Sequence, residues 1–107
     1  MSSITSDILR GHTETIILKN LLTKDSYGYE INKSIQEQTN NEFELKDATL
    51  YSAFQRLEKS GYIESYWGDE NIGARRKYYR ITTEGKIYYE ISKQAWEKAK
   101  QLIDSLI

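Results

Sequence analysis

Apolar residues follow a helical spacing along most of this chain, and only one region, residues 62–82, has the alternating character of strands. The spacing predicts helices over Thr5–Thr23, Tyr27–Thr39 and Ala48–Ser60, and a long last helix from Thr83 to the C-terminus. Phe43 and Leu45, between the second and third helices, form at most a very short strand. The order is three helices, two strands and a final helix, which predicts a mainly α fold with a small β-hairpin.

Short polar residues and glycine mark the ends of the predicted helices. The residues suited to cap the four helix starts are Ser6 or Asp7, Ser26, Asp47, and Thr82 or Thr83. Asn40-Asn41 and Gly61 are suited to end the second and third helices, because asparagine and glycine tolerate the left-handed conformation found there. The two strands of the hairpin are predicted at residues 62–67 and 77–82, with Gly68–Gly73 as a long tip.

Composition excludes several classes of protein. The 107 residues suit one domain, near the lower limit for a self-sufficient core. The absence of cysteine and the single histidine, His12, argue against a disulfide framework, a zinc cluster or a histidine-based triad. No nucleophile–base pair or glycine-rich phosphate loop is present, and Asp69-Glu70 fits a solvated turn, so we expect neither an enzyme nor a cofactor. No apolar run approaches the ~18 residues of a membrane span, which predicts a cytoplasmic protein.

Charge is segregated along the chain although its net value is only −1. The segment Ala74–Arg80 contains four cations in seven residues and no acid, whereas Glu30–Asp47 has five carboxylates against two lysines. Cations on a strand can merely protect an exposed edge from aggregation, but one or two lysines would do that. A basic run of this density is better suited to anchor phosphates, with weak non-specific affinity and sharp salt dependence.

The third predicted helix has two different sides. Leu50, Ala53, Phe54 and Leu57 form the apolar side, while Ala48, Ser52, Gln55, Arg56 and Lys59 lie opposite, with Thr49 and Tyr51 on the shoulders. Hydroxyl, amide and basic side chains suit base edges and phosphates, although a solvated helix face has the same composition. Three helices followed by a hairpin predict a winged helix-turn-helix, in which the third helix enters the major groove and the hairpin touches the backbone.

The last helix is apolar over more than half of its circumference. One stripe consists of Ile87, Ile91, Ala95, Ala99, Leu102 and Leu106, and an adjoining stripe consists of Tyr88, Trp96, Ile103 and Ile107. An apolar arc of this width exceeds what packing against one neighbouring element requires, so we predict a homodimer joined by this helix. Trp96 is then expected to anchor the interface.

Several short motifs, in this order, resemble the PadR family of transcriptional regulators over nearly the whole chain. They are Leu9-Arg10-Gly11, Tyr27-Gly28-Tyr29-Glu30-Ile31, Ala48-Thr49-Leu50-Tyr51, Arg56-Leu57-Glu58, Gly61-Tyr62-Ile63, Arg76-Lys77-Tyr78-Tyr79-Arg80 and Thr82-Thr83-Glu84-Gly85. The resemblance implies a homodimeric repressor of a palindromic operator. With the helix analysis, the residues expected at the double-stranded DNA are Tyr27, Lys46, Thr49, Tyr51, Ser52, Gln55, Arg56, Arg75, Arg76 and Lys77. Many members of the family have proline where this chain has Asp47, and a helix cap does the same local job.

Trp96 and the segment Tyr66–Glu70 resemble the short, multidrug-sensing members of the family. In those proteins two copies of the tryptophan flank a pore at the dimer centre, where flat hydrophobic compounds stack. The resemblance therefore implies a planar hydrophobic ligand and a lining of Ile8, Glu14, Thr15, Lys19, Ser92, Trp96 and Lys100. Lys100 departs from the acidic residue of that pattern, and a lysine there repels cations. Two alternatives follow: Glu14 compensates for the missing acid, or the ligand is neutral or anionic.

Two functions are compatible with these sequence features. Residues 1–82 are predicted to be a winged-helix DNA-binding domain whose N-terminal helix contributes to the dimer, and residues 83–107 a dimerisation helix. The alternative is a winged helix used for protein–protein contact without a ligand, in which the wing cations meet an acidic partner. Salt-dependent binding to a palindrome separates the two.

Overall fold

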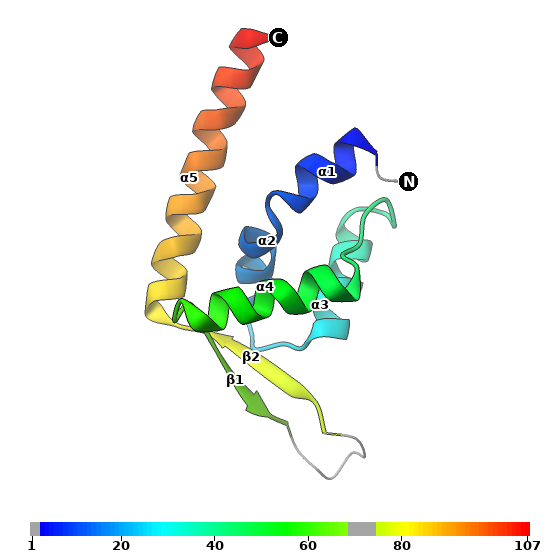
Figure 1. Ribbon diagram of the computed structural model, residues 1–107, viewed down its shortest axis with the longest axis vertical. Coiled ribbons are helices and arrows are strands. Elements are labelled where there is room, and N and C mark those ends of the chain that lie inside the picture. The colour runs from blue at the N-terminus through cyan, green and yellow to red at the C-terminus, as the bar shows by residue number, and fades with distance from the viewer. Residues whose placement is uncertain (1–2, 69–74) are drawn as a thin grey trace.

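The computed structural model describes residues 3–68 and 75–107. Its elements are α1 (Ile4–Arg10), α2 (Thr13–Leu21), α3 (Gly28–Gln38), α4 (Asp47–Lys59), β1 (Ile63–Trp67), β2 (Lys77–Ile81) and α5 (Thr83–Leu106). Helices α2, α3 and α4 with the β1–β2 hairpin form a winged helix-turn-helix, which confirms the predicted fold class. The hairpin projects from one side of this unit, and α5 runs away from it so that its C-terminal half stands clear (Figure 1).

The single helix predicted over Thr5–Thr23 is wrong, because the chain breaks at Gly11 and His12 into α1 and α2. At the break the His12 amide bonds to the Leu9 carbonyl (2.9 Å) instead of continuing the α-helical ladder. The hydroxyl of Thr13 donates to the Arg10 carbonyl (2.7 Å), so a side chain satisfies an acceptor that the interrupted helix leaves open. The apolar spacing continues across the break, which is why periodicity alone misses it.

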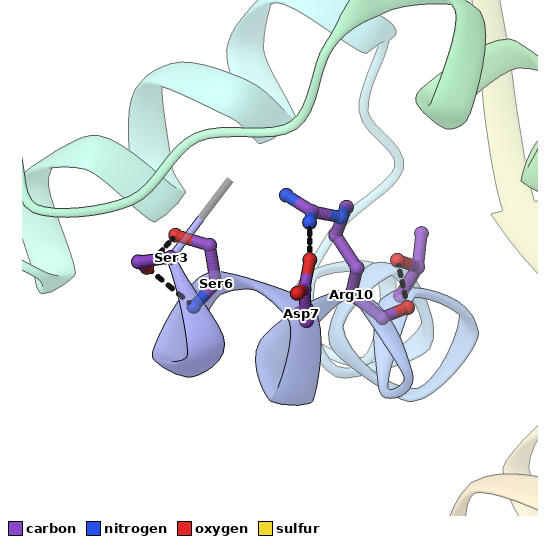
Figure 2. Close-up of polar contacts among 5 residues, drawn as sticks. Ser3, Ser6, Asp7 and Arg10 are labelled. Atoms are coloured by element: carbon purple, nitrogen blue, oxygen red, sulfur yellow. Dashed lines mark hydrogen bonds and ion pairs between the residues drawn. The ribbon is translucent and has the colours of Figure 1, made fainter. Parts of the chain in front are cut away.

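Ser3 caps the start of α1, rather than Ser6 or Asp7 as predicted. Its hydroxyl accepts from the Ser6 amide (3.0 Å) and donates to the Ser6 hydroxyl (2.9 Å), while Asp7 pairs with Arg10 one turn later (Figure 2). The helix therefore begins at Ile4, one residue before the predicted start at Thr5. A hydroxyl placed three residues before a free amide is the arrangement that N-capping requires.

Two other predicted caps are also wrong. The residues that precede α3 and α4 are Tyr27 and Lys46, and neither side chain makes a capping hydrogen bond. Ser26 pairs instead through its backbone with Tyr79, in the single bridge that joins the loop before α3 to β2. Asp47 is the first residue of α4, where its charge still favours the helix N-terminus.

The predicted helix ends and the last cap are confirmed. Asn40 and Asn41 have φ values of 51° and 64°, and Gly61 has a φ of 79°. Thr82 accepts from the Gly85 amide (3.0 Å) at the start of α5. The side chains of Phe43 and Leu45 are buried, but this loop forms no strand pairing. The Asn32 side chain instead bonds to both the amide and the carbonyl of Leu45 (2.9 and 2.7 Å).

The core lies where α2, α3 and α4 meet the base of the hairpin. The predicted apolar side of α4 is confirmed, since Leu50, Ala53, Phe54 and Leu57 are all buried. Tyr79 of β2 stacks on Phe54 with 4.0 Å between ring centroids. Burial, followed by the nearby carboxylate of Glu58, raises the pKa of Tyr79 to about 12.

The hairpin pairs antiparallel from Ile63 opposite Ile81 to Trp67 opposite Lys77. Side chains alternate between its two faces, so Ile63, Tyr79 and Ile81 meet the core while Tyr66 and Tyr78 lie on the other face. The tip predicted over Gly68–Gly73 lies, from residue 69 onward, outside the described residues.

Helix α5 buries one face against the domain and leaves another uncovered. Gly85 and Tyr89 are buried, and α5 packs against α2. The stripe predicted to join two copies is exposed: Ile91 and Leu102 expose 58% and 51% of their surface. Tyr89 was absent from both predicted stripes, yet it is the residue that ties the helix to the core. No described helix is long and apolar enough to cross a lipid bilayer.

Candidate nucleic-acid interface

The face of α4 opposite the core carries the residues predicted to read DNA. Tyr51, Ser52 and Gln55 are exposed, Thr49 is half-buried, and Lys46 is exposed at the helix start. Hydroxyl and amide groups of this kind pair with base edges, and their position near the N-terminal end of α4 is the part of a recognition helix that enters the groove. The structure therefore brings these five predicted residues onto one accessible surface.

Arg56 lies on the same helix, and its guanidinium group already contacts two other side chains of this chain. Its Nη1 donates to the Ser52 hydroxyl (3.1 Å), and its Nε reaches Oε2 of Glu14 on α2 (3.5 Å). These contacts connect α2, which packs against α5, to the polar face of α4. Since the ion pair is exposed, it contributes little to stability and a phosphate can replace it.

Each basic side chain described in the wing lies over an aromatic ring. The pairs are Arg75 over Trp67 (5.2 Å), Arg76 over Tyr27 (4.8 Å), Lys77 over Tyr79 (5.9 Å) and Arg80 over Tyr66 (5.2 Å), measured to the ring centroid. A cation that lies over a ring face keeps its charge, while the side chain that carries it loses much of its rotational freedom. The rings thereby hold the wing cations in place in the isolated chain.

An aromatic stack and one hydrogen bond fasten the wing to the loop before α3. The Tyr78 ring contacts both Tyr27 (5.2 Å) and Tyr66 (5.7 Å), and the Tyr66 hydroxyl donates to Oδ2 of Asp25 (2.5 Å). This bond to the carboxylate is the main reason that the pKa of Tyr66 is raised above its usual value. Together with the Ser26 bridge, these contacts fix the wing relative to the helix-turn-helix. We call Asp25, Tyr27, Tyr66 and Tyr78 the wing latch.

Of the wing latch, only Tyr27 is among the residues predicted to contact DNA, while Tyr66 and Tyr78 fall within the two predicted strands. The alternation of the strands could have shown that Tyr66 and Tyr78 share a face, but the partner in the loop before α3 is fixed only by tertiary structure.

Two wing cations are balanced by carboxylates. Lys77 lies 3.9 Å from Glu58 on α4, and Arg80 lies 3.6 Å from Glu64 on β1. All four side chains are substantially exposed, so the pairs are weak. Arg76, one of the three basic residues predicted on the wing, lies over the ring of Tyr27 at the start of the helix-turn-helix segment α3.

Removing the Tyr66 hydroxyl tests the wing latch. We expect Tyr66→Phe to weaken DNA binding by roughly threefold to tenfold, because an ordinary hydrogen bond that fixes the wing is lost. The slope of log affinity against log salt should stay unchanged, since no phosphate contact is removed. Titration at several salt concentrations measures both quantities.

A matched variant and a second partner separate this effect from a general loss of stability. Tyr88→Phe removes a hydroxyl outside the wing, where the ring stacks on Tyr62 (4.3 Å), and should leave DNA affinity unchanged. Asp25→Ala should weaken binding to a similar extent and add little to Tyr66→Phe. Full additivity of the two changes would show that the hydrogen bond has no role in binding.

A second candidate site is an apolar groove of about 490 Å³ where α1, α2, the end of α3 and α5 meet. Its walls are mostly apolar, and Trp96 borders it with the His12 ring packed edge-on (4.8 Å between centroids). The lining residues are Ile8, Leu9, His12, Thr15, Ile16, Lys19, Asn20, Ile35, Gln38, Thr39, Phe43, Tyr89, Lys93 and Trp96. A concave, mainly apolar site with a few polar groups is the usual form of a small-molecule site.

The groove contains four of the seven residues predicted to bind a ligand: Ile8, Thr15, Lys19 and Trp96. The other three are not among its lining residues. Glu14 is paired with Arg56, and Lys100 is paired with Glu97 (3.5 Å). Ser92 is half-buried on α5. Lys93 and His12, which are not among the predicted ligand-binding residues, also line the groove.

Metal chemistry finds no support in residues 3–68 and 75–107. No group of three or more histidine, cysteine, aspartate or glutamate side chains there is arranged to hold a metal ion.

The fold, the polar face of α4 and the basic wing together define a winged-helix DNA-binding protein. The family model of the PadR-like transcriptional regulators matches residues 17–91, and the chain belongs to this family. It is therefore a DNA-binding transcriptional regulator rather than an enzyme.

Individual proteins are similar to this chain over most of its length. An uncharacterized protein X of Lysinibacillus sphaericus is 52% identical over 101 residues, covering 94% of this chain and 93% of that protein. A transcriptional regulator from Clostridium thermocellum is 50% identical, with a TM-score of 0.89 over 98% of this chain and 99% of the other. A PadR family regulator from Clostridium difficile is 41% identical, with a TM-score of 0.75 over 89% and 97%.

Proposed function

We propose that this regulator is a homodimeric repressor of a palindromic operator, relieved by a planar aromatic ligand. The observation that carries the proposal is the uncovered apolar stripe of α5, on a chain that also presents a DNA-reading helix and a basic wing. In this proposal residues 1–82 read the DNA and residues 83–107 join the two copies, with α1 adding to the contact.

The exposed apolar surface supports the homodimer. Ile87, Ile91, Leu102 and Leu106 of α5 are all exposed, and so are Ile4 and Ile8 of α1. So many exposed large apolar residues on two helices favour an interface with another chain. A second copy covers it with the same stripe, and two-fold symmetry then matches a palindrome with half-sites about 34–36 Å apart.

The groove beside Trp96 supports relief by a ligand. It touches α5, which joins the copies, and α2, which holds Arg56 of the recognition helix through Glu14. In this proposal a compound bound there changes the angle between the two winged-helix domains, and with it the spacing of the two α4 helices. Because the half-site spacing is fixed by the DNA, a small rotation costs affinity.

The decisive experiment measures binding of the protein to its own upstream DNA, with and without a panel of planar aromatic compounds. We expect sequence-specific, salt-dependent binding that the effective compounds weaken. Fluorescence of Trp96 in a Trp67→Phe protein reports occupancy of the groove in the same samples. If compounds quench Trp96 fully and operator affinity does not change, the proposed switch is wrong.

Two substitutions distinguish phosphate anchoring from base reading. Arg76→Ala should weaken binding to all sequences and reduce the salt slope by about 1, because one phosphate contact is lost. Thr49→Ala should instead change the preference at one base position, with little change in the salt slope. Lys98→Ala, an exposed cation on α5, is the control and should change neither. If Arg76→Ala and Thr49→Ala both bind like the parent, the chain is better described as a protein-interaction module.

A further inference from the structure

We propose that Glu14 is a positioning residue whose carboxylate holds Arg56 of the recognition helix and thereby lowers the affinity of the protein for the DNA backbone. This inference deepens the proposed function, because it rests on the role of α4 in reading DNA. The features that carry it are the contacts of the Arg56 guanidinium group, the position of Glu14 in α2 and the difference between Arg56 and the neighbouring lysines.

The Arg56 guanidinium group is held at two points. Its Nε lies 3.5 Å from Oε2 of Glu14, and its Nη1 donates to the Ser52 hydroxyl (3.1 Å), one turn earlier on the polar face of α4. Because guanidinium donors point in fixed directions, an Nε aimed at a carboxylate is not aimed at a phosphate. Arg56 therefore has to leave Glu14 before this donor can serve a DNA contact.

The Glu14 carboxylate is placed independently of Arg56. Glu14 lies in the first turn of α2, where the helix N-terminus favours a negative charge. Its side chain is only 33% exposed, and α2 packs directly against α4. The buried residues Ile17 and Leu18 fix α2 in the core. The carboxylate thus stays beside Arg56 when DNA approaches, and it competes with the phosphates for the same cation.

Arg56 differs from the other cations of the recognition helix. Lys46, which precedes α4, and Lys59, its last residue, are both exposed, and neither forms an ion pair within residues 3–68 and 75–107. When Arg56 moves to a phosphate, the freed Glu14 carboxylate attracts a cation from solution, which offsets the counterion that the phosphate releases. The pair with Glu14 therefore removes about one charge from the contribution of α4 to DNA binding.

Removing the charge of Glu14 while keeping its shape tests this role. The affinity of Glu14→Gln is measured on two duplexes of equal length, the protein's own upstream DNA and an unrelated sequence, at several salt concentrations. We expect both duplexes to bind roughly threefold to tenfold more tightly at low salt, and the slope of log affinity against log salt to steepen by about 0.9. The gain should shrink as salt is added. A merely structural role of Glu14 predicts no gain.

Three further proteins identify Arg56 as the group through which Glu14 acts. In an Arg56→Gln protein, adding Glu14→Gln should change affinity by less than about twofold, because the restrained cation is already absent. Glu14→Asp keeps the charge but shortens the reach toward Arg56, so it should give part of the gain. This variant also provides the test if the glutamine lowers stability. Glu90→Gln, at an exposed acid of α5, changes the net charge equally and should behave like the parent.

The outcomes separate this inference from the function on which it rests. If Glu14→Gln, with an unchanged Tm, binds both duplexes no more tightly than the parent, the restraint is wrong while DNA binding stands. If Glu14→Gln gives the same gain in the Arg56→Gln protein, Glu14 simply repels phosphates, and its action through Arg56 is overturned. If the parent binds neither duplex, the DNA-reading role of α4 is wrong as well.

Discussion

Replacing Gly85 with alanine is expected to destabilise the protein by about 2–3 kcal/mol, although alanine is the better helix former. Gly85 lies in the first turn of α5, and a Cβ atom there would lie 2.1 Å from the Tyr62 carbonyl oxygen and 2.8 Å from the Ile81 side chain. A backbone carbonyl cannot rotate away as a flexible side chain can. The start of α5 must therefore move away from the hairpin, which breaks its close packing.

Thermal unfolding at one fixed protein concentration measures this effect, since the stability of a dimer depends on concentration. For a domain of this size the expected loss corresponds to a fall in Tm of about 10 °C or more. Gly11→Ala is the matched control, because Gly11 has right-handed helical backbone angles and the closest contact of an added Cβ is the Ile8 carbonyl at 3.2 Å. A Tm for Gly85→Ala equal to that of Gly11→Ala would contradict the packing argument.

The contacts around Gly85 attach the start of α5 to the turn that follows α4. Thr82 donates to the Gly61 carbonyl (2.7 Å) and its amide bonds to the Tyr62 carbonyl (3.1 Å), so α5 begins on the turn that follows α4. The helix proposed to join the copies is thus fixed to the end of the recognition helix without an intervening linker. A change in the angle of α5 consequently moves α4 and the wing with it.

The sequence predicted the fold well where local pattern decides structure. The apolar side of α4, the left-handed residues Asn40, Asn41 and Gly61, and the hairpin all follow from spacing and residue type. One prediction was wrong because a distant residue decides the structure. Ser26 has the chemistry of a cap, but it pairs with Tyr79, more than fifty residues away, and so contributes to the sheet instead.

The same distinction applies to the candidate sites. The polar face of α4 and the wing cations could be predicted, because helical spacing and charge density are properties of the sequence. The Asp25–Tyr66 bond and the entry of Lys93 into the groove could not, because each depends on how separate elements pack. Lys93 lies on α5, and only the position of α2 beside α5 shows that it borders an apolar site.

Placing charge on the uncovered stripe of α5 is expected to abolish the dimer and nearly all operator binding. Ile91 and Leu102 are 58% and 51% exposed and make no part of the buried core, so Ile91→Asp with Leu102→Asp should leave the winged helix folded. In a dimer, however, both carboxylates would be buried against the apolar stripe of the second copy, which is strongly unfavourable. Sedimentation should show a monomer whose circular dichroism retains the helical signature.

Loss of the dimer has a predictable effect on DNA binding, because a second half-site bound through a connected partner raises affinity by about 10²–10⁴. The double variant should therefore bind the palindrome at least 100-fold more weakly, and no better than it binds a single half-site. Lys86→Asp, a change to aspartate at an exposed position outside the two apolar stripes of α5, should remain dimeric. A double variant that stays dimeric would show that another surface joins the copies, and a monomer with full operator affinity would show that the palindrome is not read by two linked helices.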